Sequence, residues 1–595
     1  MVMSRRNLLG KTLGAAGLAA ASKVVGHASG TPTASAGPQK GAMPGLIAHW
    51  KLDGDCKDAV GKHHGEGQNV KFVEGRDGKP GGAASFNGSD ALITVDDDGD
   101  WRFGTQEFSI SAWVNVQQDV DAVPGDILTK YDPADRTGFN LGLAGSSAAY
   151  SSVGDSKNVH FGIDYGINGS WMDCGKPWKS NPLISTLAVY KNQLYTGIAD
   201  AARPEDACHV FRYAGDTEWV DCGRLGTDPL TLTAFSMAVH KGNLYCGTGV
   251  WDWAKAIPGI GGPAHVYCYE GEKRWRDCGK IGHGIRIFCL ASFKGNLYAG
   301  DDTGKCYRWD GGTNWIFAGQ LGREHRLNSM TIWRGNLYGS SHGSVFRYEG
   351  DTNWTSIGKN PYDANQIHKI QVFNGRLIAG TWPFGTVMRY EGEDKWSRMG
   401  DLGIATDKFR INEINDLRVY NGKLYAGVIP LAEVYRYESQ TRWTMLRRMV
   451  NDAFWSAEDD HSWWRVPAMT VFQGKLFHGT STCHGNADPM HPAEAGRIYS
   501  MEAGKNVSYD DDLGTGWKHV VAVRERNFLK LYINGKAVAT SGRFDGEDYL
   551  LSNRANLLIG SGQNNNFAGI MDDVRVYGGA LSADQVAELH GKAGA

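Results

Sequence analysis

One short phrase recurs seven times between residues 187 and 479, and it constrains the fold more than any other feature of the chain. In the first copy, apolar residues alternate on either side of Lys-Asn, and the later copies carry Lys-Gly-Asn, Asn-Gly-Lys or a close variant at that place. Alternation around a tight turn is typical of a β-hairpin. The copies are Leu187–Gly197, Met237–Gly247, Leu290–Gly300, Met330–Gly339, Ile370–Gly380, Leu417–Gly427 and Met469–Gly479.

A second phrase follows six of these hairpins. In Val345–Trp354, for example, a strand leads through Glu-Gly-Asp to a further strand that opens with a tryptophan. Each repeat therefore has four strands, and four strands in about 40–50 residues are typical of a β-propeller blade. The period of two along each strand excludes an α-helical solenoid. The six tryptophans are Trp219, Trp275, Trp315, Trp354, Trp396 and Trp443.

The seventh repeat ends near Gly504 without a tryptophan strand. A matching piece, Trp171–Gly175, lies upstream of the first hairpin. If this piece completes the seventh blade, the ring closes and no sheet edge is left open. The sequence therefore predicts a seven-bladed propeller over residues 169–504.

The flanking segments carry a different pattern, seen in His49–Asp53, Phe108–Val114 and Phe567–Tyr577. They resemble the early and late strands of a laminin-G-like domain, a jelly roll of the concanavalin A type. The resemblance implies one sandwich in two halves, residues 45–165 and 505–592. The predicted fold class is all-β, with a seven-bladed β-propeller inserted into a laminin-G-like jelly-roll sandwich.

The N-terminus resembles a twin-arginine signal peptide. Arg5 and Arg6 precede a short run rich in Ala and Gly, and Ala-Ser-Ala at 34–36 is a small-residue cleavage motif. Such leaders export proteins that are already folded. We expect residues 1–36 to be removed and the protein to be periplasmic or secreted. A basic disordered tail is the alternative.

Charge and hydropathy narrow the range of partners. The whole chain has a formal net charge of −3, and residues 1–36 contain basic but no acidic residues, so the remainder is more acidic. A net-acidic chain argues against nucleic acid as the main partner. No stretch reaches the roughly 18 apolar residues that a membrane span requires.

The ten cysteines do not form an obvious disulfide framework. Cys174, Cys222 and Cys278 occupy the same slot of a repeated Asp-Cys-Gly unit, so they belong to different blades and are expected to be too far apart to bridge. Small buried thiols are the simpler interpretation. Local pairing stays open for Cys246, Cys268, Cys289 and Cys306.

The residues that lead into each hairpin are expected to line one end of the propeller channel. The loops at that end are long in blades one, two and seven, which makes it the candidate functional face. In a regular strand, positions two and four residues before the recurring phrase share one side. Blades three to seven place there Arg286, Arg326, Asn328, Gln366, His368, Glu413, Asn415 and Arg465.

This set favours an anionic ligand. Propeller channels are commonly lined by polar residues that only solvate trapped water, but three arginines with a histidine and a glutamate exceed that need. Arginine binds carboxylates and sulfates in a bidentate manner, so we expect an acidic poly- or oligosaccharide. Trp382 is a candidate for stacking on a sugar face, and core packing is the alternative for its ring. The same two interpretations apply to Trp455, Trp463 and Trp464.

Several polysaccharide lyases and a few glycosidases use seven-bladed propellers, which is an analogy of fold alone. On that analogy we favour a lyase that cleaves a uronate-containing polysaccharide by β-elimination. His368 would be the base, and the arginines and amides would neutralise the carboxylate of the uronate. In a glycoside hydrolase Glu413 would be the acid, and a second carboxylate would be needed. The remaining alternatives are a glycan-binding protein without turnover and a protein-interaction scaffold. The sandwich would be a glycan-binding accessory.

Two metal sites are considered. The laminin-G-like resemblance implies Ca²⁺, with Asp53, Asp572 and Asp573 as candidate ligands. The segment Cys483–His491 also carries metal-capable side chains, although a polar lid is the simpler interpretation.

Overall fold

The computed structural model describes residues 43–116, 123, 125–145, 152–178, 183–200, 204–250, 264–323, 326–404, 412–450, 464–481, 494 and 496–592. Almost all of its regular elements are β-strands, and the described residues contain one α-helix, α1 (Ala583–Lys592). The all-β fold class is confirmed. The predicted leader, residues 1–36, lies outside the described residues.

Seven four-stranded antiparallel blades make up the propeller in the part of the chain that the structure describes. The recurring phrase supplies the two inner strands of each blade. The innermost strands contact one another in a closed circuit, from β11 through β15, β19, β23, β27, β31 and β35 back to β11, so together they line the channel.

The blades follow one another along the chain. Blade one is β11 (Leu183–Tyr190), β12 (Gln193–Ala199), β13 (His209–Gly215) and β14 (Glu218–Arg224). Blade two is β15 (Thr233–His240), β16 (Asn243–Gly249), β17 (His265–Tyr269) and β18 (Trp275–Lys280). Blade three is β19 (Ile287–Phe293), β20 (Asn296–Asp301), β21 (Lys305–Trp309) and β22 (Trp315–Gln320). Blade four is β23 (Ser329–Trp333), β24 (Asn336–Ser340), β25 (Ser344–Gly350) and β26 (Asn353–Lys359).

The last three blades complete the ring. Blade five is β27 (Gln366–Phe373), β28 (Arg376–Trp382), β29 (Thr386–Gly392) and β30 (Lys395–Asp401). Blade six is β31 (Glu413–Tyr420), β32 (Lys423–Ile429), β33 (Glu433–Ser439) and β34 (Arg442–Arg448). Blade seven is β35 (Arg465–Phe472), β36 (Lys475–Ser481) and β37 (Ile498–Met501), with β10 (Met172–Asp173) as its outermost strand. The predicted closure is confirmed by the pairing of Met172 with Ser500.

The repeated tryptophans join neighbouring blades. The indole N–H of Trp219 in blade one donates to the backbone oxygen of Cys174, 2.8 Å away, and Trp275 of blade two donates to Cys222 in the same way. Both cysteines are buried, and the described cysteines are all free thiols. Trp315 bonds Cys278 in the same way, whereas Trp354 and Trp443 bond the backbone oxygens of Ala318 and Met399, so the tryptophan can join two blades whichever residue fills the cysteine slot.

The recurring phrase ends in glycine because the next blade comes close at that point. A Cβ atom on Gly427 would lie 2.4 Å from the backbone oxygen of Val466, and one on Gly380 would lie 2.5 Å from Cγ2 of Ile414. Both neighbours belong to the innermost strand of the following blade. Any side chain there would push two closely packed blades apart.

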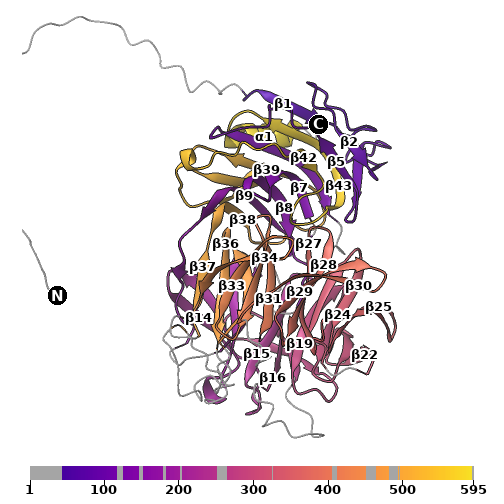
Figure 1. The fold of residues 1–595 in the computed structure, drawn as a ribbon, viewed down its shortest axis with the longest axis vertical. Helices are drawn as coiled ribbons and strands as arrows, with labels where there is room; N and C mark the ends of the chain where they lie inside the picture. The colour runs from indigo at the N-terminus through magenta and orange to yellow at the C-terminus, as the bar shows by residue number, and fades with distance from the viewer. Residues whose placement is uncertain are drawn as a thin grey trace, which may run out of the picture. The chain divides into compact units, whose positions relative to one another are not determined.

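The sandwich consists of two sheets, each built from both flanks of the propeller. Figure 1 shows indigo strands of the first flank lying with yellow strands of the last. For example, β6 (Phe108–Val116) pairs with β39 (Gly516–Arg524) along its whole length, as the split domain predicts.

The first sheet has the order β3 (Lys71–Val73), β4 (Ala83–Asn87), β43 (Ala568–Tyr577), β6, β39, β40 (Leu529–Ile533) and β41 (Lys536–Thr540), and β1 (Leu46–Trp50) also pairs with β43. The second has the order β2 (Glu66–Gln68), β5 (Leu92–Val95), β42 (Leu557–Ile559), β7 (Gly125–Asp132), β8 (Thr137–Ala144), β9 (Asn158–Asn168) and β38 (Ala503–Tyr509). Trp50, Phe108, Phe139 and Phe161 are fully buried in the core between them.

The sandwich binds the hairpin-turn end of the propeller. In blade five the backbone N–H of Asn374 donates to the backbone oxygen of Asn564, and in blade six Gly422 donates to the side-chain oxygen of the same residue, both at 3.0 Å. In blade two Lys241 donates to Asp155, 2.8 Å away. The residues that lead into the hairpins are therefore at the end of the inner strands away from the sandwich.

One sandwich segment also pairs with the inner edge of a blade. Val153 forms a parallel bridge with Ala291 of β19; its N–H donates to Leu290 and its oxygen accepts from Ser292, both at 2.9 Å. This pairing covers part of the blade-three edge at the sandwich end of the channel.

Candidate functional site

The predicted site residues begin the inner strands at the channel mouth. Gln366, Glu413 and Arg465 are the first residues of β27, β31 and β35, and they pair with the last residues of the neighbouring strands. The mouth therefore collects one polar residue from each of blades five, six and seven at the end that the sandwich leaves free.

A histidine and a glutamate meet across the boundary between blades five and six. His368 Nε2 lies 3.2 Å from Oε1 of Glu413, and the two residues are 7% and 5% exposed. The side-chain amide of Asn415 donates to the same glutamate oxygen, and the Asn415 backbone also hydrogen-bonds to His368. Asn415 is completely buried, so it holds the pair in place.

The electrostatics of this cluster keep the imidazole neutral. Burial lowers the pKa of His368; the Glu413 carboxylate opposes this effect, and the charges of Arg465 and Arg326 add to it. A neutral imidazole beside a carboxylate can accept a proton from a bound ligand. Two guanidinium groups near it can bind an anion. Both arginines are partly exposed.

Arg286 packs against two aromatic rings on the same rim of the channel mouth. Its guanidinium carbon lies 4.9 Å from the ring centre of Phe235 and 5.4 Å from that of Phe288, and its Nε donates to the backbone oxygen of Val250, 2.7 Å away. Cation–π contacts of this kind fix the direction of a guanidinium group. Arg286 is 5% exposed and is therefore nearly buried.

The other predicted ligands differ in their surroundings. The amide of Asn328 donates to the backbone oxygen of Ile367, 3.2 Å away, and thus joins blades four and five. Gln366 and Trp382 are partly exposed partners in the β27–β28 ladder. Trp464 is 2% exposed within a hydrophobic core, so it cannot stack on a sugar. Trp455, Trp463 and Cys483–His491 lie outside the described residues.

Sequence reasoning missed a second charged pair next to this cluster. Lys369 Nζ lies 3.1 Å from Asp416 Oδ1, with both residues buried. Strict alternation would point Lys369 away from the side of His368. The pairing register shifts between Ile367 and Lys369, however, and again between Ile414 and Asp416, as at a β-bulge. The available signal was that these two repeats carry a charged residue just before the hairpin phrase, where the other repeats carry Thr, Ser, Cys or Ala.

The carboxylates considered as calcium ligands form ion pairs with cationic side chains. Arg76 Nε lies 2.8 Å from Asp572, Arg575 lies 2.9 Å from Asp573, and Asp53 pairs with Lys79. The arginine pairs leave Asp572 and Asp573 without the several free oxygens that a hard cation needs. We therefore assign no calcium role to them.

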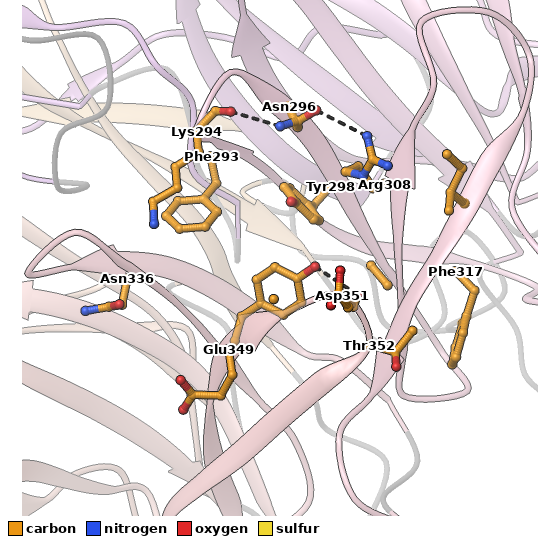
Figure 2. A pocket seen from close by; sticks show the side chains of 14 residues that line it. Phe293, Lys294, Asn296, Tyr298, Arg308, Phe317, Asn336, Glu349, Asp351 and Thr352 are labelled. Atoms are coloured by element: carbon orange, nitrogen blue, oxygen red, sulfur yellow. Dashed lines mark hydrogen bonds between the residues drawn. The ribbon is translucent and has the colours of Figure 1, made fainter.

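A separate groove of about 640 Å³ lies between blades three and four. Figure 2 shows Phe317 on one side of it and Lys294 and Asn296 on the other, with Arg308 reaching Asn296. Ile316 and Phe317 are each 46% exposed. The sequence carries one signal for this groove. After the tryptophan that opens the fourth strand, blade three carries Ile-Phe, whereas blades one and two carry Val-Asp and Arg-Asp. No predicted site residue lines this groove.

The comparison with family models gives a match in the C-terminal part of the chain. Residues 477–587 match the family model of the concanavalin A-like lectin/glucanases superfamily. A search of curated proteins finds no match. No helix in the described residues is long and apolar enough to cross a membrane.

Solved structures similar to the chain include propellers of diverse proteins. Virginiamycin B lyase from Staphylococcus aureus is 9% identical, with a TM-score of 0.40, over 56% of this chain and 99% of its own. The WD40 β-propeller domain of Doa1 is 8% identical, with a TM-score of 0.39, over 56% and 97%. The extracellular domain of BT4673 from B. thetaiotaomicron is 14% identical, with a TM-score of 0.40, over 61% and 46%. These likenesses concern the fold alone.

Proposed function

We propose that the chain is an exported carbohydrate-active protein that binds an acidic glycan at the channel mouth and cleaves it by β-elimination. The observation that carries this proposal is the buried contact between His368 and Glu413, with Arg326 and Arg465 near enough to affect the histidine pKa. A base beside two cations is what removal of a proton next to a carboxylate requires.

In the proposed reaction, Arg326 and Arg465 bind the uronate carboxylate and reduce its negative charge. This makes the neighbouring C5 proton more acidic. The imidazole of His368 takes that proton, the electron pair forms the C4–C5 double bond, and the C4–O bond breaks. The departing sugar oxygen takes up a proton, so the products are one saturated and one unsaturated chain end. Glu413 orients the imidazole and stabilises its protonated form.

The sandwich is proposed as a glycan-binding accessory, in agreement with its match to the concanavalin A-like lectin/glucanases superfamily. The outer face of β8, β9 and β38 is used for contact with the propeller, since Asn140 and Asn506 contact Asn421 and Tyr420 there. Accessory binding would therefore fall to the other faces and the end loops of the sandwich.

Binding without turnover at the same mouth is the second candidate. The observation in its favour is the low exposure of His368 and Glu413, which a ligand would have to reach. A glycoside hydrolase at the same mouth would use Glu413 as its acid and would need a second carboxylate about 5–9.5 Å away from it.

The test is a screen of the mature chain on uronate-containing polysaccharides. Ultraviolet absorbance would report the unsaturated product, and calorimetry would report binding. We expect His368→Ala to keep binding and to lose about 10²–10⁴-fold in turnover. Arg326→Ala should weaken binding by about 2–5 kcal/mol. Binding without absorbance would support the second candidate, and absence of both would contradict a glycan function.

A further inference from the structure

A buried histidine faces two carboxylates in the loops at one end of the sandwich, far along the chain from the channel-mouth residues. His63 belongs to the loop between β1 and β2, and Asp98 and Asp100 belong to the loop between β5 and β6. Nε2 of His63 lies 3.2 Å from Oδ2 of Asp98 and 3.0 Å from Oδ2 of Asp100. The His63 side chain is 6% exposed.

Asp58 determines which nitrogen of His63 carries the hydrogen. Its carboxylate accepts the backbone N–H groups of His49, Val60 and His63. Asp58 Oδ2 also lies 3.2 Å from His63 Nδ1, so a hydrogen on Nδ1 is in position to be donated to it.

In the neutral tautomer with its hydrogen on Nδ1, the opposite nitrogen, Nε2, presents a lone pair. The groups that face Nε2 at hydrogen-bond distance are the oxygens of Asp98 and Asp100, which are acceptors as well. Three electron pairs thus converge on one point from a buried imidazole and two carboxylates. Such an arrangement is stable only when a positive charge lies between them.

We propose that His63, Asp98 and Asp100 are the protein ligands of a divalent transition-metal ion such as Mn²⁺ or Zn²⁺. One atom from each of the three residues lies within 4.8 Å of the others. An imidazole nitrogen among carboxylate oxygens favours these ions over Ca²⁺, which takes oxygen ligands. Asp58 then has the role of the carboxylate that commonly orients a metal-bound histidine.

Lys62 is the competing cation. Its Nζ lies 3.2 Å from Asp98 and 3.5 Å from Asp100, but its side chain is 69% exposed. An exposed lysine on a flexible stem can leave the carboxylates at little cost when a divalent ion arrives. A proton on Nε2 is the other competitor, and it makes metal affinity fall as the pH falls.

The ion would join two loops that otherwise meet through ring packing. Trp101, next to Asp100, lies 4.5 Å from the His63 ring and 5.7 Å from Trp50 between ring centres. Metal binding to the folded chain alone should raise its melting temperature in proportion to the logarithm of metal concentration. The readout is thus independent of any activity at the channel mouth.

The experiment titrates the full mature chain with Mn²⁺, followed by electron paramagnetic resonance and calorimetry. Mn²⁺ is chosen because it binds thiols poorly and so avoids the cysteines. We expect one site per chain that Asp100→Asn weakens at least about tenfold. Asp58→Asn, which removes no ligand, should weaken it about 10–100-fold. His283→Gln is the control and should leave the site unchanged, because His283 is an exposed histidine in the loop between β18 and β19.

Asp100→Asn is the decisive variant because Asp100 is half exposed and its loss should not prevent folding. Nitrogen NMR of His63 supplies the second measurement. The proposal is overturned if Mn²⁺ and Zn²⁺ do not bind, or if binding is the same in Asp100→Asn, or if Nε2 stays protonated in saturating metal. A Nε2 resonance shifted by the metal, together with loss of the site in Asp100→Asn, supports it.

Discussion

Nε2 of His368 and Oε1 of Glu413 lie 3.2 Å apart across the boundary between two propeller blades. The two residues belong to successive blades. The side-chain amide of Asn415 donates a hydrogen bond to the glutamate oxygen. The pair therefore exists only when blades five and six are packed together. Its environment can be tested by changing either partner.

Glu413→Gln should lower the pKa of His368 further. The carboxylate is the nearby group that raises this pKa, against burial and the two arginines, so its neutral replacement removes that support. Carbon-labelled histidine followed by NMR would measure the shift. If the proposed elimination holds, the acid limb of the pH–rate profile moves to lower pH while kcat falls. A rise in the His368 pKa would contradict the assigned contact.

Gly427→Ala should destabilise the propeller by about 1–3 kcal/mol, the usual cost of overpacking. The added Cβ would lie 2.4 Å from the Val466 oxygen of the next blade. Denaturant unfolding measures the change. Gly45→Ala is the matched control, since a Cβ there meets nothing within 4 Å. Equal stability of the two variants would refute the close-approach explanation for the repeated glycine.

Removal of the buried imidazole of His478 should make stability less sensitive to acid. Burial lowers the His478 pKa from 6.5 to about 3, so the unfolded chain binds a proton that the folded chain rejects. The contribution of neutral His478 is complete above pH 6.5 and is lost as the pH falls toward 3. Between these two pH values, this histidine changes the free energy of unfolding by about 1.4 kcal/mol per pH unit.

His478→Phe keeps a ring against Trp171, whose centre lies 4.8 Å from that of the histidine. Its unfolding free energy, measured at a series of pH values, should fall less steeply below pH 6.5 than that of the wild type. The exposed His283, changed to Phe, should leave the slope as it is. Parallel curves for the wild type and His478→Phe would disprove the assignment.

Replacement of Arg5 and Arg6 by lysine should retain the precursor in the cytoplasm. The twin-arginine route reads the arginine pair itself, so equal charge should not rescue export. Cell fractionation and immunoblotting with an antibody to the mature chain would measure the distribution. Unchanged export would assign the leader to another route.

The repeat and the flanking motifs were enough to predict the architecture. Seven copies of one hairpin phrase, each with a period of two, leave few alternatives to a propeller, because local alternation and turn chemistry are encoded residue by residue. The missing tryptophan strand near Gly504 and the surplus strand at Trp171 also predicted the closure that joins Met172 to Ser500. Such features depend on short windows of sequence.

The chemistry of the clusters was decided by the tertiary structure. Strand periodicity placed His368, Glu413 and Asn415 on one rim, but only blade packing brings His368 of blade five against Glu413 of blade six. Likewise, Asp572 is available to a metal in the sequence alone and is bound by Arg76 in the fold. Arg76 and Asp572 lie 496 residues apart in the chain. Their pairing depends on bulges, loop paths and burial, which arise from the sum of many long-range contacts and leave no local pattern to read.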